Sequence, residues 1–443
     1  MTIYDLIGIG FGPSNLALAV AIEEESAKNP RSPLKVKFLE KKQKFQWHPG
    51  MLLENTDVQI SFMKDLILMK NPQSPFTFIN YLYQNGRLND FINLRQFFPS
   101  RIEFNDYFGW VARQLTPYVS YGKEVVSIQP TVEGSGGTCE VKFIKIVVKD
   151  ILSGESEEYH ARNLVVATGG TPHVPKSITL EKNSNVFHSN DFLNKFHREF
   201  SDRSKSYHFV VVGSGQSAAE IFYSLSKAYP QSQIQCALRQ FSFNAADDSE
   251  FINEIFHPQM VDYLYLLPKR KRKELLDAHR HTNYSVVDKE LIRAIYKMLY
   301  DQKVSGHLRS EIVPFVEIES TSETDDGVVA HFRHLHNETR LNFEADAVIL
   351  ATGYKREVCH SILSGISNYL LKDESGYVID RNYQIKTRLD FHPKVFLQGY
   401  SEETHGLSNT LLSLLPYRSF DILQTLLETS NSKNFVRKAV VTR

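Results

Sequence analysis

The chain has 443 residues and carries 51 basic and 51 acidic side chains, so its formal net charge is zero at pH 7. That balance argues against a protein that binds nucleic acid through bulk electrostatics. The strongest basic cluster, Lys269–Lys273, follows Pro268 and is interpreted as the solvated start of a helix. A hydrophobic content of 42% and a charged content of 23% are ordinary for a globular enzyme, and the length fits two or three domains.

The three cysteines, Cys139, Cys236 and Cys359, lie far apart, and none belongs to a C-x-x-C pair. This spacing predicts neither a disulfide framework, a dithiol redox centre nor a zinc site, and we expect no bound metal. No apolar run approaches the ~18 residues that a membrane helix needs. Because a strand is predicted almost from Met1, no signal peptide is expected, and we interpret the protein as cytoplasmic with no integral membrane segment.

The first motif is a glycine turn between a strand and a helix, in IYDLIGIGFGPSNLALAVAI. The apolar run over residues 3–9 predicts a buried parallel strand, and residues 14–22 predict a helix. The turn between them contains Gly8, Gly10 and Gly12. Such a turn lets the backbone approach a pyrophosphate, while the free N–H groups of the helix N-terminus bind the phosphates.

Two further residues bear on this turn. Pro13 stands where the standard fingerprint has a third glycine or alanine, and proline suits the first turn of a helix because no hydrogen bond is lost there. The next strand, LKVKFLE, ends in Glu40. Since an acidic residue at this strand end commonly binds ribose hydroxyls, the segment predicts a dinucleotide site.

A second glycine turn follows in HFVVVGSGQSAAEIF, with regular G-x-G-x-x-A spacing at Gly213, Gly215 and Ala218. The strand after it, IQCALRQ, ends at Arg239 instead of an acid. An arginine there can bind a 2′-phosphate in bidentate geometry, which favours NADPH over NADH. The alternative is that Arg239 is simply an exposed side chain.

Two Ala-Thr-Gly segments, at 167–169 and 351–353, each follow an apolar strand. In flavoproteins with two dinucleotide domains, such segments occur where the chain crosses between the domains. We therefore expect an α/β fold with two Rossmann-like dinucleotide-binding domains. The FAD domain is expected from both ends of the chain, 1–175 and 340–443, and the NADPH domain over 205–339. Because the sequence has no C-x-x-C pair, it does not fit the disulfide reductases that share this architecture. The remaining functions for such a flavoprotein are an oxidase or a monooxygenase.

Longer motifs are more specific. They are FGPSNLALA, FQWHPGML, QISFMKDL, NPQSPFTFINYL, DDSEFINEIF, NYSVVD, ATGY and THGLSNTLLSLL, and they run along nearly the whole chain. In these motifs the sequence resembles the N-hydroxylating flavin monooxygenases of siderophore biosynthesis, and within them the L-ornithine N5-monooxygenases.

The resemblance implies FAD- and NADPH-dependent hydroxylation of the side-chain amine of L-ornithine to N5-hydroxyornithine, for hydroxamate siderophores. NADPH would reduce FAD, the reduced flavin would take O₂ to form a C4a-hydroperoxide, and the amine would attack its distal oxygen. Oxidised nicotinamide is expected to stay bound and shield the hydroperoxide. Because the chemistry belongs to the cofactor, no side chain is expected to be catalytic. The family also suggests a homotetramer.

The resemblance assigns binding residues by position. The implied FAD residues are Gly8, Gly10, Gly12, Pro13, Ser14, Glu40, Lys41, Lys42, Gln43, Lys44, Phe45, Gln46, Trp47, His48, Gln59, Val125, Thr410, Leu411 and Leu412. The implied NADPH residues are Ser214, Gly215, Gln216, Ser217, Arg239, Asn283, Tyr284 and Ser285. The implied substrate residues are Lys64, Asn253, Glu254, Ile255, Phe256, Asn283 and Ser413, with substrate segments near 247–256 and 281–288.

Lys64 illustrates the chemistry behind these assignments. Alternation in QISFMKDL would place Lys64 on one face with Ile60 and Phe62. A lysine on an apolar face is costly unless it is paired with an anion, and a substrate carboxylate is a natural partner. The alternative partner is Asp65 or another acid.

Asn253 and Asn283 are neutral amides, which can bind either end of an amino acid and leave the reacting amine uncharged. Alone, each would more often be a cap or turn residue. Trp47 and His48 could cover the cofactor, or be a core aromatic and a capped histidine. The last helix is expected to point its N-terminus at the flavin pyrimidine and to be kinked by Pro416.

Three alternative functions stay open. The first is a lysine N6- or diamine N-hydroxylase of the same fold, although the lysine enzymes generally lack NEIF and NYSVVD. The second is a sulfide or Baeyer–Villiger monooxygenase, whose F-x-G-x-x-x-H fingerprint has no match in NVFHSNDFL despite Phe187 and His188. The third is a flavin-binding NADPH sensor, against which the intact set Lys64, Asn253 and Asn283 argues.

Overall fold

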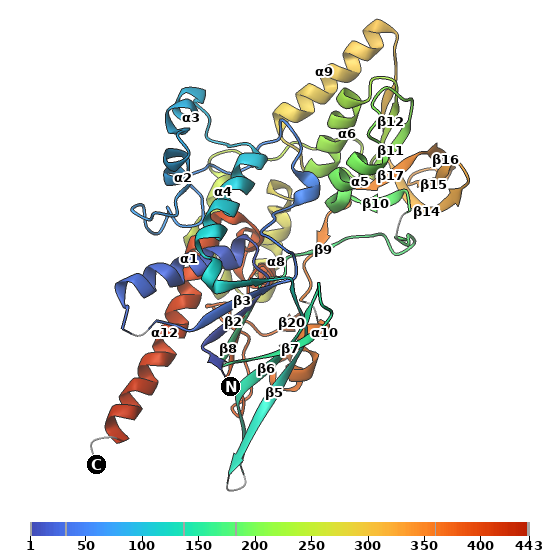
Figure 1. Ribbon diagram of the computed structural model, residues 1–443. Helices are drawn as coiled ribbons and strands as arrows, with labels where there is room; N and C mark the ends of the chain where they lie inside the picture. The colour runs from blue at the N-terminus through green and yellow to red at the C-terminus, as the bar shows by residue number, and fades with distance from the viewer. Residues whose placement is uncertain (1, 32, 136–137, 182–183, 359, 441–443) are drawn as a thin grey trace.

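The computed structural model describes residues 2–31, 33–135, 138–181, 184–358 and 360–440, which form two bodies (Figure 1). The chain crosses between them at β9 (Thr171–Pro172) and β18 (Tyr354–Lys355), which pair antiparallel. Each Ala-Thr-Gly segment comes directly before one of these strands, so the chain crosses between the bodies where the sequence predicted.

The first body contains a parallel sheet of order β21-β8-β2-β3-β4. Its strands are β2 (Leu6–Ile9), β3 (Val36–Glu40), β4 (Val119–Tyr121), β8 (Asn163–Val166) and β21 (Lys394–Leu397). Helix α1 (Pro13–Lys28) packs against the C-terminal helix α12 (Leu415–Val440) beside this sheet (Figure 1). Both ends of the chain therefore build this body, as predicted.

The second body contains a parallel sheet of order β10-β17-β11-β12-β13. Its strands are β10 (Val186–His188), β11 (His208–Val212), β12 (Gln233–Ala237), β13 (Ser310–Val313) and β17 (Ala347–Leu350). Helices α5 (Phe192–Glu199), α6 (Gln216–Ala228) and α9 (Lys289–Ser305) belong to this body. Two Rossmann-like units, the predicted fold class, are thus confirmed.

The pairing of β17 differs from the domain boundary drawn at residue 340. Residues 347–350 pair in register with 209–212 of β11, so this strand belongs to the second sheet. The chain returns to the first body only at β18. An apolar strand fits either sheet equally well, and its sequence does not indicate which one it joins.

Smaller sheets extend both bodies. A four-stranded sheet contains β1 (Ile3–Tyr4), β5 (Lys123–Ser135), β6 (Thr138–Asp150) and β7 (Ser156–Ala161). A three-stranded antiparallel sheet contains β14 (Val316–Thr324), β15 (Gly327–His334) and β16 (Arg340–Ala345), and β19 (Lys372–Asp373) pairs with β20 (Gly376–Tyr377). The single strand predicted over residues 3–9 is thus divided between two sheets.

The other helices lie in the connections. They are α2 (Phe78–Gln84), α3 (Leu88–Leu94), α4 (Arg101–Gln114), α7 (Pro258–Leu266), α8 (Lys269–Ala278), α10 (His360–Leu363) and α11 (Glu402–His405). The 3-10 turns are η1 (Pro49–Met51), η2 (Thr116–Tyr118), η3 (Ser189–Asp191), η4 (Ile252–Phe256), η5 (Arg280–Thr282), η6 (Ser364–Tyr369), η7 (Leu407–Thr410) and η8 (Leu412–Leu414). Helix α8 begins at Lys269, as the basic cluster predicted.

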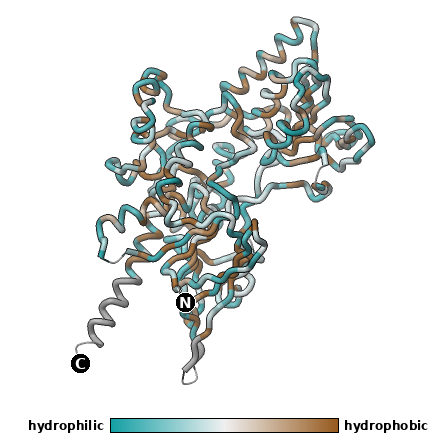
Figure 2. Tube along the Cα trace, viewed as in Figure 1, coloured by the Kyte–Doolittle hydropathy of each residue, from teal (hydrophilic) through white to brown (hydrophobic). Residues whose placement is uncertain are grey.

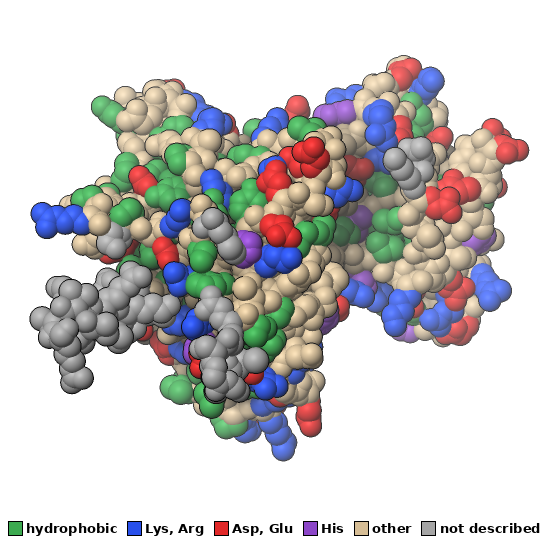
Figure 3. Space-filling view, turned by 60° about the horizontal axis from the view of Figure 1, so that its bottom comes forward, with side chains coloured by type: hydrophobic (Ala, Val, Ile, Leu, Met, Phe, Trp, Pro, Cys, Tyr) green, Lys and Arg blue, Asp and Glu red, His purple; other side chains and the backbone are tan. Residues whose placement is uncertain are grey.

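The apolar strands and helix faces lie inside each body, with hydrophilic segments outside (Figure 2). In the first body, one cluster of buried side chains unites α1, α4 and α12, and includes Leu16, Phe104 and Ile422. On the face shown in Figure 3, acidic and basic side chains are interspersed. Among the described residues, no helix combines the length and apolar character needed to cross a lipid bilayer.

Two local predictions were wrong. Pro416 is the second residue of α12, where its missing N–H breaks no hydrogen bond, so it starts the helix and does not kink it. The segment QISFMKDL forms turns and bends, not an alternating strand. The carboxylate of Asp65 accepts backbone N–H groups from Ile67, Leu68 and Phe78, and these bonds fold the chain locally.

Candidate functional site

The first glycine turn has the geometry of a phosphate cradle. Gly10 has φ +82°, and a Cβ there would lie 2.7 Å from the carbonyl oxygen of Ala167. At Gly12, the N-cap of α1, a Cβ would meet nothing within 4 Å, so the space before the helix is open. The first turn of α1 has neither a capping side chain nor an acidic residue. Its free N–H groups therefore fit a pyrophosphate.

Glu40 lies beside this turn. One oxygen of its carboxylate accepts the backbone N–H of Phe11 at 2.7 Å, and the other accepts the N–H of Lys42 at 2.9 Å. The predicted ribose-binding acid therefore also braces the glycine turn.

The run after Glu40 continues along the first body. Trp47 packs edge-on against Phe104 and Phe108, so part of its ring belongs to the core. The Nζ of Lys42 donates to the carbonyl of Gln46 at 3.3 Å, and burial lowers its pKa. The other predicted residues differ in exposure: Lys41, Gln43, Lys44 and Gln59 are exposed, Phe45 and Gln46 are half-buried, and Val125 is buried.

His48 lies where the two bodies meet. Its ring packs edge-on against Tyr354, which also contacts His188, and His188 bonds the carbonyl of Gly353 at 2.9 Å. Burial, followed by the charges of Arg101, Arg356 and Lys42, lowers the pKa of His48 to about 4. The residue as a whole is nevertheless exposed to solvent.

The second glycine turn brings two predicted NADPH segments together. Gly215 is the N-cap of α6, and a Cβ there would lie 3.8 Å from the Cα of Ser285, which has φ +58°. The amide oxygen of Gln216 accepts the N–H of Asp288 at 2.9 Å. Like α1, α6 has no capping side chain and no acid in its first turn.

Arg239 comes two residues after the end of β12 and is largely exposed. Its guanidinium lies 3.6 Å from the carboxylate of Glu317 on β14. This acidic neighbour was not foreseen, because it approaches from a separate sheet. Arg239 is thus accessible to a phosphate but already has a weak anionic partner.

The predicted substrate residues come from three separate segments. Lys64 is half-buried, and no ion pair joins it to a carboxylate among the described residues. The alternative partner Asp65 is committed to backbone N–H groups, and burial raises its pKa to about 6. The side chain of Asn253 donates to the carbonyl of Asp248 at 2.8 Å and so braces its own loop.

The segments predicted to bind nicotinamide and flavin meet at Tyr284. Its hydroxyl donates to the carboxylate of Glu402 and lies 3.2 Å from the hydroxyl of Thr410. The turn η4, which carries Asn253 and the predicted Glu254, Ile255 and Phe256, packs against η7, which ends at Thr410. Burial raises the pKa of Glu402. Burial and the negative charge of Glu402 together raise the pKa of Tyr284 to about 12.

The segment around Thr410 contains buried polar atoms that lack a partner among the described residues. They are the hydroxyls of Ser401 and Ser413 and the amide nitrogen of Asn409. Ser413 is a predicted substrate residue, and it follows Leu411 and Leu412, which are half-buried. Because buried polar groups are normally satisfied, these atoms are available to a water or a ligand.

Sequence reasoning missed Arg356, Glu402 and Arg418. Arg356 lies two residues after the motif ATGY, and its charge acts on His48, Tyr284 and Glu402. Only the folding of distant segments onto one another shows that these charges converge. The composition of these segments did not indicate that the charges converge.

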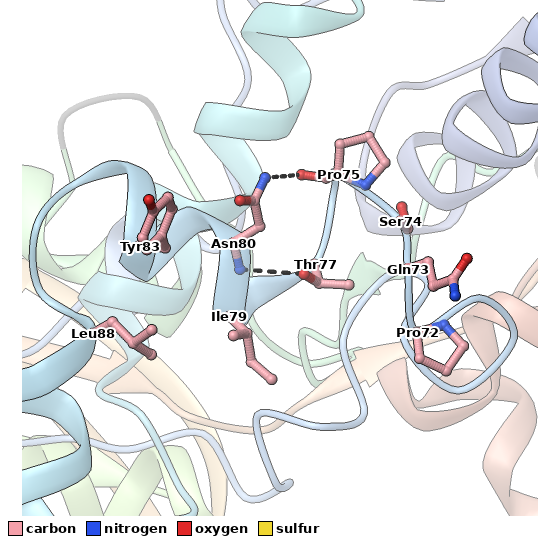
Figure 4. Close-up of a pocket in the computed structure, with 9 residues that line it drawn as sticks. All are labelled: Pro72, Gln73, Ser74, Pro75, Thr77, Ile79, Asn80, Tyr83 and Leu88. Carbon is pink, nitrogen blue, oxygen red and sulfur yellow. Dashed lines mark hydrogen bonds between the residues drawn. The ribbon is translucent and has the colours of Figure 1, made fainter.

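A surface pocket on α2 is separate from these residues (Figure 4). The side-chain amide of Asn80 donates to the carbonyl of Pro75 at 2.6 Å, and its backbone N–H donates to the hydroxyl oxygen of Thr77, the N-cap of α2, at 3.2 Å. The lining of the pocket contains no predicted site residue and no charged side chain.

Two uncapped helix N-termini, each after a glycine turn of a parallel sheet and linked by paired crossing strands, define a dinucleotide-binding oxidoreductase of the two-domain flavoprotein class. The family model described as L-lysine 6-monooxygenase/L-ornithine 5-monooxygenase matches residues 2–356. The chain belongs to this family of monooxygenases.

Relatives support the assignment along the whole chain. The L-ornithine N(5)-monooxygenase of Pseudomonas aeruginosa is 39% identical over 426 residues, which are 96% of this chain and 94% of that protein. The solved ornithine hydroxylase from the same species has a TM-score of 0.89, covering 96% of this chain and 99% of that one. The Kutzneria sp. 744 ornithine N-hydroxylase, solved with reduced FAD, NADP⁺ and L-ornithine, has a TM-score of 0.90 at 34% identity, covering 97% and 100%.

Proposed function

We propose that the protein hydroxylates the side-chain amine of L-ornithine to N5-hydroxyornithine, for hydroxamate siderophore biosynthesis, with FAD, NADPH and O₂. The observation that carries the proposal is the contact of Tyr284 with Glu402 and Thr410. It joins the segment assigned to nicotinamide and substrate to the segment assigned to flavin. The similar proteins that are named for ornithine support the choice of substrate.

FAD is assigned to the first glycine turn with Glu40, the run through His48, Gln59, Val125 and residues 410–412. NADPH is assigned to the second turn, with Arg239 for the 2′-phosphate and residues 283–285 closing over it. The open space at Gly12 and the uncapped first turns of α1 and α6 fit these dinucleotides. Bound FAD supplies the oxygen-activating chemistry, with electrons from NADPH.

The protein's own residues place and prepare the substrate. Lys64 binds the carboxylate, which removes the cost of an unpaired, half-buried ammonium. Asn253, whose side-chain nitrogen is partly engaged, offers its amide oxygen to the α-ammonium. Neutral neighbours such as Asn283 and the His48 ring leave the far amine free to lose its proton, which a nucleophile requires.

The overall reaction consumes ornithine, NADPH, O₂ and one proton, and it yields hydroxyornithine, NADP⁺ and water. One oxygen atom enters the amine, and the other leaves as water. We further propose a homotetramer in the cytoplasm. The FAD domain comprises both chain ends and the NADPH domain the middle, with the second crossing after Leu350.

The test is an assay of hydroxylamine formation by the purified chain with FAD, NADPH and O₂. Ornithine, lysine and putrescine are compared side by side, with peroxide release measured in parallel. Ornithine is expected to give hydroxylamine, and lysine mostly peroxide. Hydroxylation of lysine or putrescine in preference to ornithine would replace the proposal by the lysine or diamine alternative.

A further inference from the structure

Arg418, the fourth residue of α12, is a buried cation that pairs with no carboxylate among the residues the structure describes. Only 2% of its surface is exposed. Its guanidinium donates to the side-chain oxygen of Gln398 at 3.0 Å, to the carbonyl of Asn409 at 2.5 Å and to the hydroxyl of Ser14 at 3.0 Å. All three acceptors are neutral, and no ion pair joins Arg418 to a carboxylate in the part of the chain that the structure describes.

The surroundings add positive charge. Burial lowers the pKa of Arg418 to about 10; Tyr383 acts in the opposite direction, and the charge of Arg356 lowers it further. His405 is nearby and neutral, since burial and the neighbouring arginines hold its pKa at about 4. By contrast, Arg381 is paired with Asp262 and Asp421. A buried charge is costly unless it is paired, so the absence of a counterion here requires an explanation.

The hydrogen bonds of Arg418 lead directly to the first glycine turn. Ser14 is the second residue of α1, immediately after Gly12 and Pro13. Gln398, which binds Arg418, also donates to the side-chain oxygen of Asn15 at 2.9 Å, and Asn15 donates to the carbonyl of Gly10 at 2.7 Å. Arg418 therefore contacts the first turn of α1 through the hydroxyl of Ser14, next to the glycine cradle.

We propose that Arg418 is the countercharge of the FAD pyrophosphate, acting through Ser14. This inference rests on the proposed assignment of FAD to the first turn. The partial positive charge of a helix N-terminus compensates a pyrophosphate only in part, and a full cation in a low-dielectric interior adds to it. In return, the dinucleotide supplies the anion that Arg418 lacks. FAD binding and the docking of α12 onto α1 are thereby coupled.

The experiment uses the full-length chain from which FAD has been removed. It measures the affinity for added FAD, and the thermal stability without and with FAD. Arg418→Gln removes the charge and keeps a hydrogen-bonding side chain, while Arg418→Lys keeps the charge. Arg381→Gln is the matched control, because that arginine already has its carboxylates. FAD is titrated by quenching of its fluorescence, and melting temperature is recorded with and without FAD.

Arg418→Gln is expected to raise the Kd for FAD about tenfold or more and to reduce the stabilisation that FAD gives. Arg418→Lys should stay within about threefold of the wild type, and Arg381→Gln should leave the Kd unchanged. If Arg418→Gln binds FAD like the wild type, or if it lowers both melting temperatures equally, the inference is overturned. A tenfold loss of FAD affinity in Arg418→Lys would also overturn the inference. If the glutamine variant does not fold, the test depends on Arg418→Lys alone.

Failure of the proposed function has a different signature. In that case the wild-type chain itself would not bind FAD or would not form hydroxylamine from any amine. Tight binding by the wild type with no effect at Arg418 would reject the countercharge alone.

Discussion

Arg101 and Glu220 are joined by two hydrogen bonds, 2.9 and 2.7 Å long, that connect helix α4 of the first body to helix α6 of the second. The same carboxylate accepts the side-chain amide of Gln216 at 2.9 Å. The pair therefore links the relative placement of the two bodies to a residue assigned to NADPH.

Removing one member of this buried pair should be strongly destabilising. We expect Arg101→Ala to lower the free energy of unfolding by about 3–5 kcal/mol, because Glu220 is left as an uncompensated buried charge. The double variant Arg101→Met, Glu220→Leu should lose less than Arg101→Ala. Urea unfolding of the three proteins measures this, and a double variant that is less stable than the single one would contradict the interpretation.

Coupling of NADPH use to hydroxylation should depend on Gln216. Its amide oxygen holds the N–H of Asp288, and its amide nitrogen binds Glu220. Gln216→Ala should loosen the nicotinamide and raise the peroxide released per NADPH consumed, and Ser285→Ala should act in the same direction. Peroxide and hydroxylamine are measured in the same reaction. Slower flavin reduction with unchanged coupling would show that bound nicotinamide does not shield the site.

Arg239 should decide between NADPH and NADH. A bidentate arginine–phosphate pair contributes ~1.5–3 kcal/mol, so Arg239→Ala should cost roughly tenfold or more in kcat/KM with NADPH and little with NADH. Glu317→Gln is the informative companion, since its carboxylate lies 3.6 Å from the guanidinium and would compete with the 2′-phosphate that we assign to Arg239. It should lower the KM for NADPH. Equal losses with both nucleotides in Arg239→Ala would remove the 2′-phosphate assignment.

Substrate choice should follow from a fixed distance between Lys64 and the flavin. One extra methylene moves the amine of lysine by about a bond length, and a misplacement of ~1 Å can cost on the order of 10²-fold in rate. Lys64→Ala should therefore raise the KM for ornithine far more than it slows flavin reduction. Stopped-flow reduction and steady-state hydroxylation separate the two effects. Unchanged apparent affinity would show that Lys64 is not the carboxylate anchor.

Acid should destabilise the fold through His405. Its pKa is about 4 in the folded protein, below the ordinary 6.5, so the folded state binds fewer protons than the unfolded state between these values. The stability it contributes is complete above pH 6.5 and is lost as the pH falls towards 4. His405→Gln should flatten this slope in urea unfolding at several pH values. If the free energy of unfolding of the variant depends on pH as steeply as that of the wild type, the acid destabilisation comes from other groups.

The sequence predicted what depends on local pattern. Features with a required backbone geometry could be located from the sequence. They are both glycine turns, strand β3 ending at Glu40 and the crossings at residues 167–169 and 351–353. Three features could not be located in this way: the sheet that β17 joins, the start of α12 before Pro416 and the turns around Lys64. These depend on contacts between distant segments, which override local preference.

The same limit applies to the charges of the site. Glu317, Glu402 and Arg418 reach their partners from other sheets or from the opposite end of the chain. Their sequence neighbours gave no indication of this. Motifs therefore located the cradle residues, while the residues that compensate and orient them became visible only in the fold.

Strand β21, formed by residues 394–397, pairs with β8 and completes the sheet that begins with β2. During synthesis, the second sheet is finished once β17 has emerged, whereas the first must wait for β21 and α12. The N-terminal strands and the first glycine turn therefore spend the longest time without their final neighbours. Because pairing of such distant segments is slow and exposes strand edges, this half of the protein is where chaperones and early cofactor capture would matter most.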